Sequence, residues 1–196
     1  FLACMILTAL ALLLTLGLAF TVASLGPLDW GPVFGAYLAS LLLASSYIAI
    51  GLYISSKTDS QIICLISTVV VGLVFYFVGS DVIVGILSNS MGETFRLLGT
   101  GSRFDSISRG VLDLRDIYYY VSLAAVFLSL NVLSLEKTKW STETTKPSYF
   151  QMNMAVALVV LNFLAVNVWL HKMRSLRLDI TKDHVYSISQ ASKDII

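Results

Sequence analysis

Five stretches of this chain contain no Asp, Glu, Lys or Arg over a length that can cross a lipid bilayer. A transmembrane helix needs about 20 consecutive, mainly apolar residues to cover a hydrocarbon core about 30 Å thick. The whole chain is 57% hydrophobic and only 13% charged, whereas soluble domains carry about 25% charged residues. We therefore predict an all-α polytopic membrane protein with a bundle of five transmembrane helices. The predicted spans are about 1–26, 32–55, 61–80, 117–135 and 148–171.

Composition and motifs argue against several classes of function. A net charge of +1 and the lack of a basic block give no basis for nucleic-acid binding. The two cysteines, Cys4 and Cys64, lie in or beside apolar runs and have neither metal-ligand nor disulfide spacing. No phosphate-binding G-x-x-x-x-G-K-[ST] sequence occurs, and no span carries a Ser/His or paired-Asp constellation. We expect no catalytic residue, metal site or cofactor site in this chain.

The segment before the fourth span predicts an amphipathic helix at the membrane interface. At about 100° per residue, four charged residues fall within a narrow arc. We expect i,i+4 pairs from Asp105 to Arg109 and from Arg109 to Asp113, in a helix that continues into the span without a break. The functional hypothesis is an outer gate, and the alternative is a solvated connector lying on the bundle. The candidate gate residues are Asp105, Arg109, Asp113, Arg115 and Asp116.

The second span carries small residues at helical spacing. Small residues let helix backbones approach closely in a membrane, where lipid provides no hydrophobic drive for association. We predict a packing face within a bundle or a dimer; the alternative is the ordinary abundance of small residues in membrane helices. The residues of this face are Gly35, Ala39, Ser46 and Ala49.

The C-terminal part changes character twice. Residues 141–147 form a polar, Pro-containing linker, the best domain boundary in the chain. Residues 148–171 form the fifth span, whose amides should bond across to another helix; they are Gln151, Asn153, Asn162 and Asn167. Alternating apolar residues from Leu176 to Ile180 then predict a strand, so that 172–196 would begin a soluble α/β domain.

Three motifs carry a resemblance to known families. Residues 108–116, SRGVLDLRD, followed by a Tyr-rich start and one apolar span, resemble the last span of type-2 ABC exporter permeases, above all the gliding-motility permease. Residues 51–61, GLYISSKTDSQ, resemble the turn after the fourth span of such permeases. Residues 177–189, RLDITKDHVYSIS, resemble the segment after the membrane anchor of the gliding-motility auxiliary subunit.

The resemblance implies an organisation and a set of partners. Residues 1–140 would be the C-terminal part of a permease, 148–171 an added anchor, and 172–196 the beginning of an extracytoplasmic domain. The chain would be a multi-pass protein of the bacterial inner membrane and a transport subunit, not an enzyme. Its partners would be the lipid bilayer, a second permease copy in a homodimer, and an ABC ATP-binding subunit that holds ATP and Mg. The candidate ATPase-facing turn is Lys57, Thr58 and Asp59.

Two questions stay open at this level. The resemblance places Lys57 and Lys137 in the cytoplasm and Arg109 outside, whereas the excess of arginines on the outer side is the reverse of the positive-inside rule. A structural anchor for a gliding-motility or secretion complex, which moves no substrate, is the main alternative function, and an intramembrane enzyme is a third. The transported substrate has no signature in the sequence.

Overall fold

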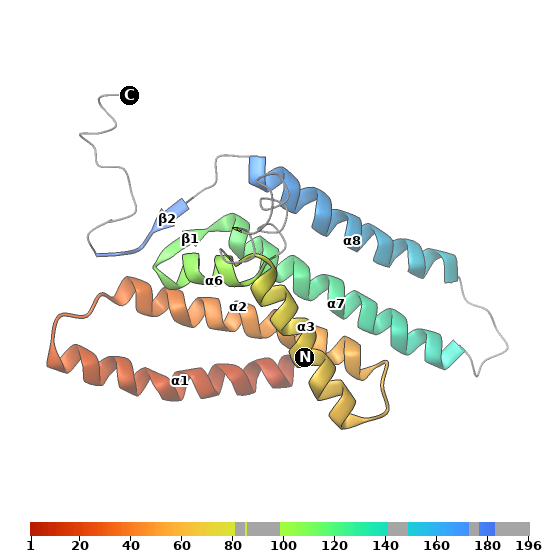
Figure 1. The fold of residues 1–196 in the computed structure, drawn as a ribbon, viewed down its shortest axis with the longest axis horizontal. Helices are drawn as coiled ribbons and strands as arrows, with labels where there is room; N and C mark the ends of the chain where they lie inside the picture. The colour runs from red at the N-terminus through yellow and green to blue at the C-terminus, as the bar shows by residue number, and fades with distance from the viewer. Residues whose placement is uncertain (81–84, 86–98, 141–148, 173–176, 183–196) are drawn as a thin grey trace.

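The computed structural model describes residues 1–80, 85, 99–140, 149–172 and 177–182. The described part contains six helices and two short strands (Figure 1). In chain order they are α1 (Leu2–Leu25), α2 (Trp30–Ser55), α3 (Gln61–Val78), α6 (Gly101–Ser108), β1 (Val111–Asp113), α7 (Leu114–Trp140), α8 (Tyr149–Lys172) and β2 (Arg177–Asp179). Five of the helices, all except α6, are long and apolar enough to cross a membrane. The prediction of a helical fold is therefore confirmed, and the five apolar helices are compatible with a multi-pass membrane protein.

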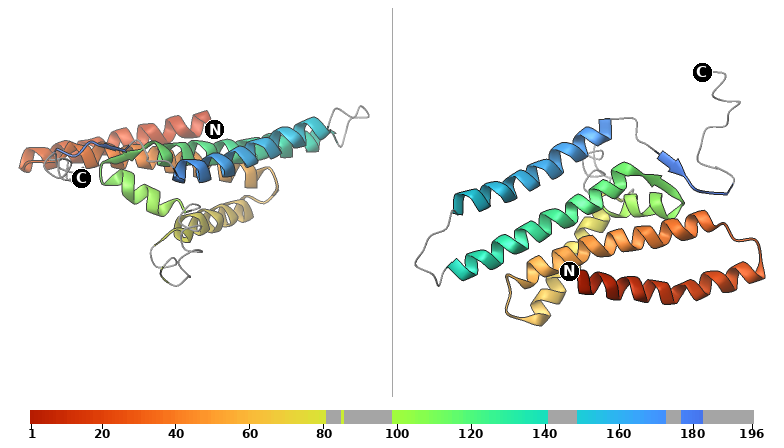
Figure 2. Two further views of the ribbon diagram at one scale, coloured as in Figure 1. Left: turned by 90° about the horizontal axis from the view of Figure 1, so that it is seen from above. Right: turned by 180° about the vertical axis from the view of Figure 1, so that it is seen from behind.

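Four of the long helices lie side by side in one layer, in the order α1, α2, α7, α8 (Figures 1 and 2). Helices α2 and α7 run parallel, because Ser46 hydrogen-bonds the Tyr120 carbonyl and Ser134 hydrogen-bonds the Ser56 carbonyl further along both helices. Helices α3 and α6 lie on one face of this layer, and α3 leaves it at an angle (Figure 2). The α2–α7 contact is therefore the centre of the bundle.

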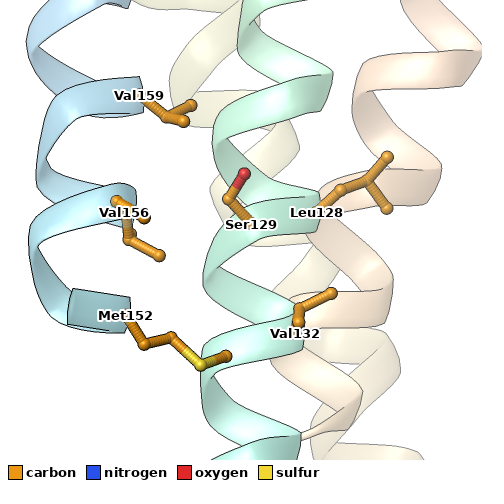
Figure 3. Close-up of a pocket in the computed structure, with 7 residues that line it drawn as sticks. Leu128, Ser129, Val132, Met152, Val156 and Val159 are labelled. Atoms are coloured by element: carbon orange, nitrogen blue, oxygen red, sulfur yellow. The ribbon is translucent and has the colours of Figure 1, made fainter. Parts of the chain in front are cut away.

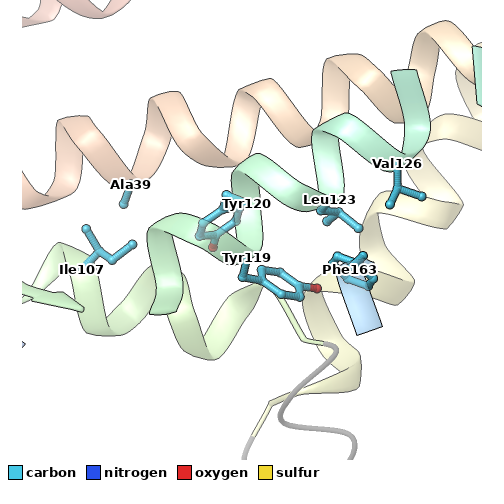
Figure 4. Packing of buried hydrophobic residues seen from close by; sticks show 7 residues of the cluster. All are labelled: Ala39, Ile107, Tyr119, Tyr120, Leu123, Val126 and Phe163. Carbon is cyan, nitrogen blue, oxygen red and sulfur yellow. The ribbon is translucent and has the colours of Figure 1, made fainter. Parts of the chain in front are cut away.

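The core lies where α2, α6, α7 and α8 meet. Figure 4 shows Ile107 of α6 and the aromatic rings of α7 filling the space between the helices. The buried cluster consists of Ala39, Ile107, Tyr119, Tyr120, Leu123, Val126 and Phe163. The long apolar side chains of α1 are largely exposed, as expected for a helix that faces lipid, because lipid solvates Leu as well as a protein core does.

Polar contacts join α7 to α8. The Tyr118 hydroxyl donates to Asn162 Oδ1 at 2.7 Å, and Asn167 Nδ2 donates to the Ser122 hydroxyl at 3.3 Å. The prediction that the amides of the fifth span bond across to another helix is confirmed for these two residues.

The prediction of one unbroken helix from 104 into the fourth span is wrong. Helix α6 ends at Ser108, and Gly110 adopts φ +85°, a left-handed conformation that only Gly takes up without strain. The strand β1 follows, and α7 then begins at Leu114 with Asp113 as its cap, since Asp113 Oδ1 accepts the Arg115 N–H at 2.9 Å. The helical periodicity of this segment concealed the break because the strand's partner lies far away in the sequence.

That partner is the strand predicted after the fifth span. β2 pairs antiparallel with β1, in the register Val111 with Asp179, Leu112 with Leu178 and Asp113 with Arg177. The chain after α8 therefore returns to the bundle and joins a segment that belongs to residues 1–140. The predicted linker 141–147 and residues 183–196 lie outside the described residues.

Candidate functional site: a buried polar cluster between α6 and α7

A charged pair lies inside the bundle. Arg103 Nη1 donates to Asp116 Oδ1 at 2.7 Å, and each side chain is only 6% exposed. The Arg103 guanidinium also lies 4.3 Å from the centre of the Tyr119 ring, within the range of a cation–π contact. Charged groups in membrane bundles are costly unless paired, and they commonly mark functional positions. This pair is the strongest candidate for a functional site in the described residues.

Tyrosine hydroxyls hold the start of α6 at the same place. The Tyr120 hydroxyl donates to the Thr100 carbonyl at 2.7 Å. The Tyr47 hydroxyl donates to the Gly72 carbonyl at 2.8 Å and lies 3.1 Å from Thr100 Oγ1. Because Tyr47 has a single hydroxyl proton, Thr100 is the donor in the second contact. Thr100 N–H in turn donates to the Phe75 carbonyl at 2.9 Å, so α2, α3 and α7 all bind the first turn of α6.

Glycines allow α6 to come this close. A Cβ atom at Gly35 of α2 would overlap the Ile107 carbonyl, and one at Gly101 would lie 2.6 Å from the Tyr76 carbonyl. At the end of α3, Gly79 and Gly99 lie backbone to backbone, because a Cβ at Gly79 would lie 2.7 Å from the Gly99 Cα. Helix α6 thus occupies a slot that larger side chains would close.

The predicted packing face of α2 is buried. Gly35, Ala39, Ser46 and Ala49 are all buried in the bundle. Gly35 lies against Ile107, and Ser46 donates to the Tyr120 carbonyl at 3.1 Å. Within this chain, the small residues of α2 therefore form the surface against which α6 and α7 pack.

The five predicted gate residues do not share one face. Asp113 and Asp116 are buried, at 4% and 5% exposure, whereas Asp105 and Arg109 are exposed. Asp113 pairs with Arg115 at 3.2 Å and Asp116 pairs with Arg103. The predicted i,i+4 pair of Arg109 with Asp113 is wrong because residues 109–113 form a turn and a strand, in which positions four apart do not face each other.

Arg103 is a candidate functional residue that the sequence did not reveal. It precedes the predicted amphipathic stripe and is 13 residues from Asp116, with a turn and a strand between them. No helical or strand periodicity connects positions separated in that way. A lone Arg close to a membrane span was the only available signal.

The predicted ATPase-facing turn lies at the opposite end of the bundle. Lys57 and Asp59 are exposed, and the Thr58 hydroxyl donates to the Ile54 carbonyl at 3.1 Å, which ends α2. The Ser134 hydroxyl donates to the Ser56 carbonyl at 3.3 Å, so this turn is attached to α7. The two exposed charges are available to a partner.

A shallow apolar groove runs between α7 and α8 (Figure 3). Its volume is about 320 Å³. Its lining residues are Leu128, Ser129, Val132, Met152, Ala155, Val156 and Val159. The Ser129 hydroxyl already donates to the Ala125 carbonyl at 2.7 Å, so the groove offers an apolar surface suited to lipid chains.

In the part of the chain that the structure describes, no group of three His, Cys, Asp or Glu side chains is placed to hold a metal ion. No protein-family model, curated protein sequence or solved structure matches this chain. The site is a desolvated ion pair, bounded by tyrosines, that joins α7 to α6, a helix too short to cross a membrane.

Proposed function

We propose that this chain is the membrane-spanning part of an ABC exporter permease, which moves substrate across the bacterial inner membrane with ATP hydrolysed by a partner subunit. The proposal starts from the resemblance of residues 51–61 and 108–140 to type-2 permeases. The observation that carries it is the placement of α6, an eight-residue helix that lies within the bundle and is held there by the Arg103–Asp116 pair. Charge pairs within membrane bundles commonly mark transport pathways.

In this proposal α6 is the moving part of an outer gate. Its described contacts with α2, α3 and α7 include the hydrogen bonds at Thr100, the Arg103–Asp116 ion pair and the buried side chain of Ile107, and opening would require all of them to break. Breaking the pair exposes two charges, which are stable only in a hydrated pathway, so the open state is linked to the entry of water or a polar substrate group. The closed state then excludes water.

The free energy of ATP hydrolysis would be transmitted to the chain at the end of the bundle away from α6. The turn of Lys57, Thr58 and Asp59 is the proposed contact with the ATP-binding subunit, which would carry ATP and Mg. Movement of this turn reaches α7 through the Ser134–Ser56 hydrogen bond and passes along α2 to Ser46 and Tyr120. A second permease copy would complete the pathway, as the resemblance implies.

The test is purification of the protein in mild detergent, with mass spectrometry of the proteins that accompany it. We expect a stoichiometric ATP-binding subunit and vanadate-sensitive ATPase activity in the complex. The double variant Lys57→Glu/Asp59→Lys should lose that subunit, whereas Arg109→Glu, exposed at the other end, should keep it. Recovery of the protein without any ATP-binding subunit would contradict the proposal.

A structural anchor is the second candidate, and one observation favours it. Residues Arg177–Asp179, which follow α8, pair with β1, as would suit a bundle that holds a domain outside the membrane. Co-purification of an envelope or motility protein in place of an ATPase would favour this function.

A further inference from the structure

The segment Arg177–Lys182 contacts two separate parts of the bundle. β2 pairs with β1, and beyond the strand the Ile180 N–H donates to the Gly110 carbonyl at 3.0 Å. The Lys182 N–H donates to Asp29 Oδ2 at 3.3 Å, and Asp29 lies in the hairpin between α1 and α2. We call this set of contacts, between 177–182 and residues 29–31 and 110–113, the clasp.

Two glycines, Gly31 and Gly110, allow the close approach of Ile180 and Thr181 in the clasp. A Cβ atom at Gly31 would overlap the Ile180 carbonyl and lie 2.9 Å from the Thr181 Cα. A Cβ at Gly110 would lie 3.0 Å from the Thr181 methyl group. Thr181 is 5% exposed, although it lies outside any helix or strand. The fit is therefore that of a packed interface and not of a loop resting on a surface.

Gly110 links the clasp to α6. Its N–H donates to the Ile107 carbonyl at 2.9 Å in the last turn of α6, and its carbonyl accepts from Ile180. Ile107 is fully buried against Gly35 and the core cluster. The same peptide segment thus contacts the C-terminal strand on one side and the end of α6 on the other.

We propose that the clasp couples the position of the segment Arg177–Lys182 to that of α6. Withdrawal of the segment removes the partner of β1 and of the Gly110 carbonyl, and α6 then leaves its slot and exposes Ile107. A change in the position of residues 177–182 can in this way control the interior of the bundle. This coupling does not require the chain to be an exporter.

The first measurement establishes the clasp in the membrane. In a background with Cys4→Ser and Cys64→Ser, the pair Leu112→Cys/Leu178→Cys places two thiols directly opposite each other in the strand register. Opposed residues of an antiparallel pair lie about 4.5–5.5 Å apart at Cα, within the range a disulfide needs. The control Val111→Cys/Leu178→Cys places the thiols on opposite faces of the sheet. We expect a disulfide in the first protein and none in the second.

The second measurement reads the coupling at α6. In the same background, Ile107→Cys is treated with a membrane-impermeant maleimide, alone and with Gly31→Val, whose side chain displaces Ile180. The matched control is Gly26→Val in the same hairpin, where an added side chain meets nothing within 4 Å. We expect labelling about tenfold faster with Gly31→Val, equivalent to about 1.4 kcal/mol, and unchanged with Gly26→Val. Thr181→Arg, outside the helices, should act as Gly31→Val does and keeps the test open if Gly31→Val does not fold.

The outcomes separate cleanly. Gly31→Val is also added to the Leu112→Cys/Leu178→Cys protein. Loss of the disulfide there, together with faster labelling of Ile107→Cys by the maleimide, supports the coupling. Loss of the disulfide with unchanged labelling overturns it, since the clasp is then open while α6 stays buried. Failure of the Leu112–Leu178 disulfide to form in the Cys4→Ser/Cys64→Ser background, without Gly31→Val, also overturns the proposal.

Discussion

Arg103 Nη1 lies 2.7 Å from Asp116 Oδ1, and this ion pair joins α6 to α7 around the turn that separates them. The arginine also faces the Tyr119 ring, which has the Tyr120 ring at its edge. Both charges are withdrawn from water and from lipid, so their attraction acts at low dielectric, where it is strong and where the loss of either partner is costly.

We expect Arg103→Met to destabilise the protein by about 3–5 kcal/mol, because it leaves the Asp116 carboxylate buried without its cation. The double variant Arg103→Met/Asp116→Leu removes both charges and should recover most of that loss. The free energy of unfolding, measured by SDS titration in mixed micelles, checks both.

The matched control is Arg115→Met, because Arg115 is 28% exposed beside Asp113. In this variant the Asp113 carboxylate keeps the backbone N–H of residue 115 as a partner, so we expect a smaller loss than for Arg103→Met. If Arg115→Met costs as much as Arg103→Met, burial of the pair is not the cause of its importance.

Gly35→Ala should loosen the contact between α2 and α6. The added methyl would overlap the Ile107 carbonyl, and overpacking of this kind costs about 1–3 kcal/mol. Gly17→Ala in α1 has nothing within 4 Å of its new methyl and should be neutral or stabilising by up to about 1 kcal/mol, since Ala is the better helix former. Thermal unfolding in detergent compares the two, and equal effects would argue against a tight α2–α6 contact.

Asp29 has two functions that two substitutions can separate. Its Oδ1 accepts the Gly31 N–H at 2.9 Å and caps α2, and its Oδ2 accepts from Lys182. Asp29→Ala should cost about 1 kcal/mol through the lost cap, whereas Asp29→Asn keeps a good capping group and should cost only a few tenths. The free energy of unfolding checks this, and equal losses would show that the cap is not the stabilising contact. The Leu112–Leu178 disulfide should form more slowly in both variants, because both weaken the clasp.

Orientation can be measured at exposed positions on the two ends of the bundle. We expect Arg109→Cys and Lys182→Cys to react with an impermeant thiol reagent in intact cells, and Lys57→Cys and Lys137→Cys to react only after the membrane is opened. All four positions are exposed, so access to the reagent depends on the side of the membrane. The reverse pattern would support the positive-inside count over the topology that the resemblance implies.

Much of the architecture was predictable from the chain alone. The predicted spans 32–55 and 61–80 correspond to α2 at Trp30–Ser55 and α3 at Gln61–Val78. The strand predicted around Leu178 is β2. The break at Gly110 was missed, although Gly is a signal for it, because the charged residues on either side kept a helical spacing across the turn.

The sequence by itself determined the five apolar helices, because a helix satisfies its backbone hydrogen bonds internally and needs only a long enough apolar run to remain in lipid. Only the tertiary structure decided which polar groups meet. The Arg103–Asp116 pair, the β1–β2 register and the contact of Lys182 with Asp29, 153 residues away in the chain, all depend on packing between elements. Such contacts have no periodicity in sequence, because the fold and not the spacing of residues brings their partners together.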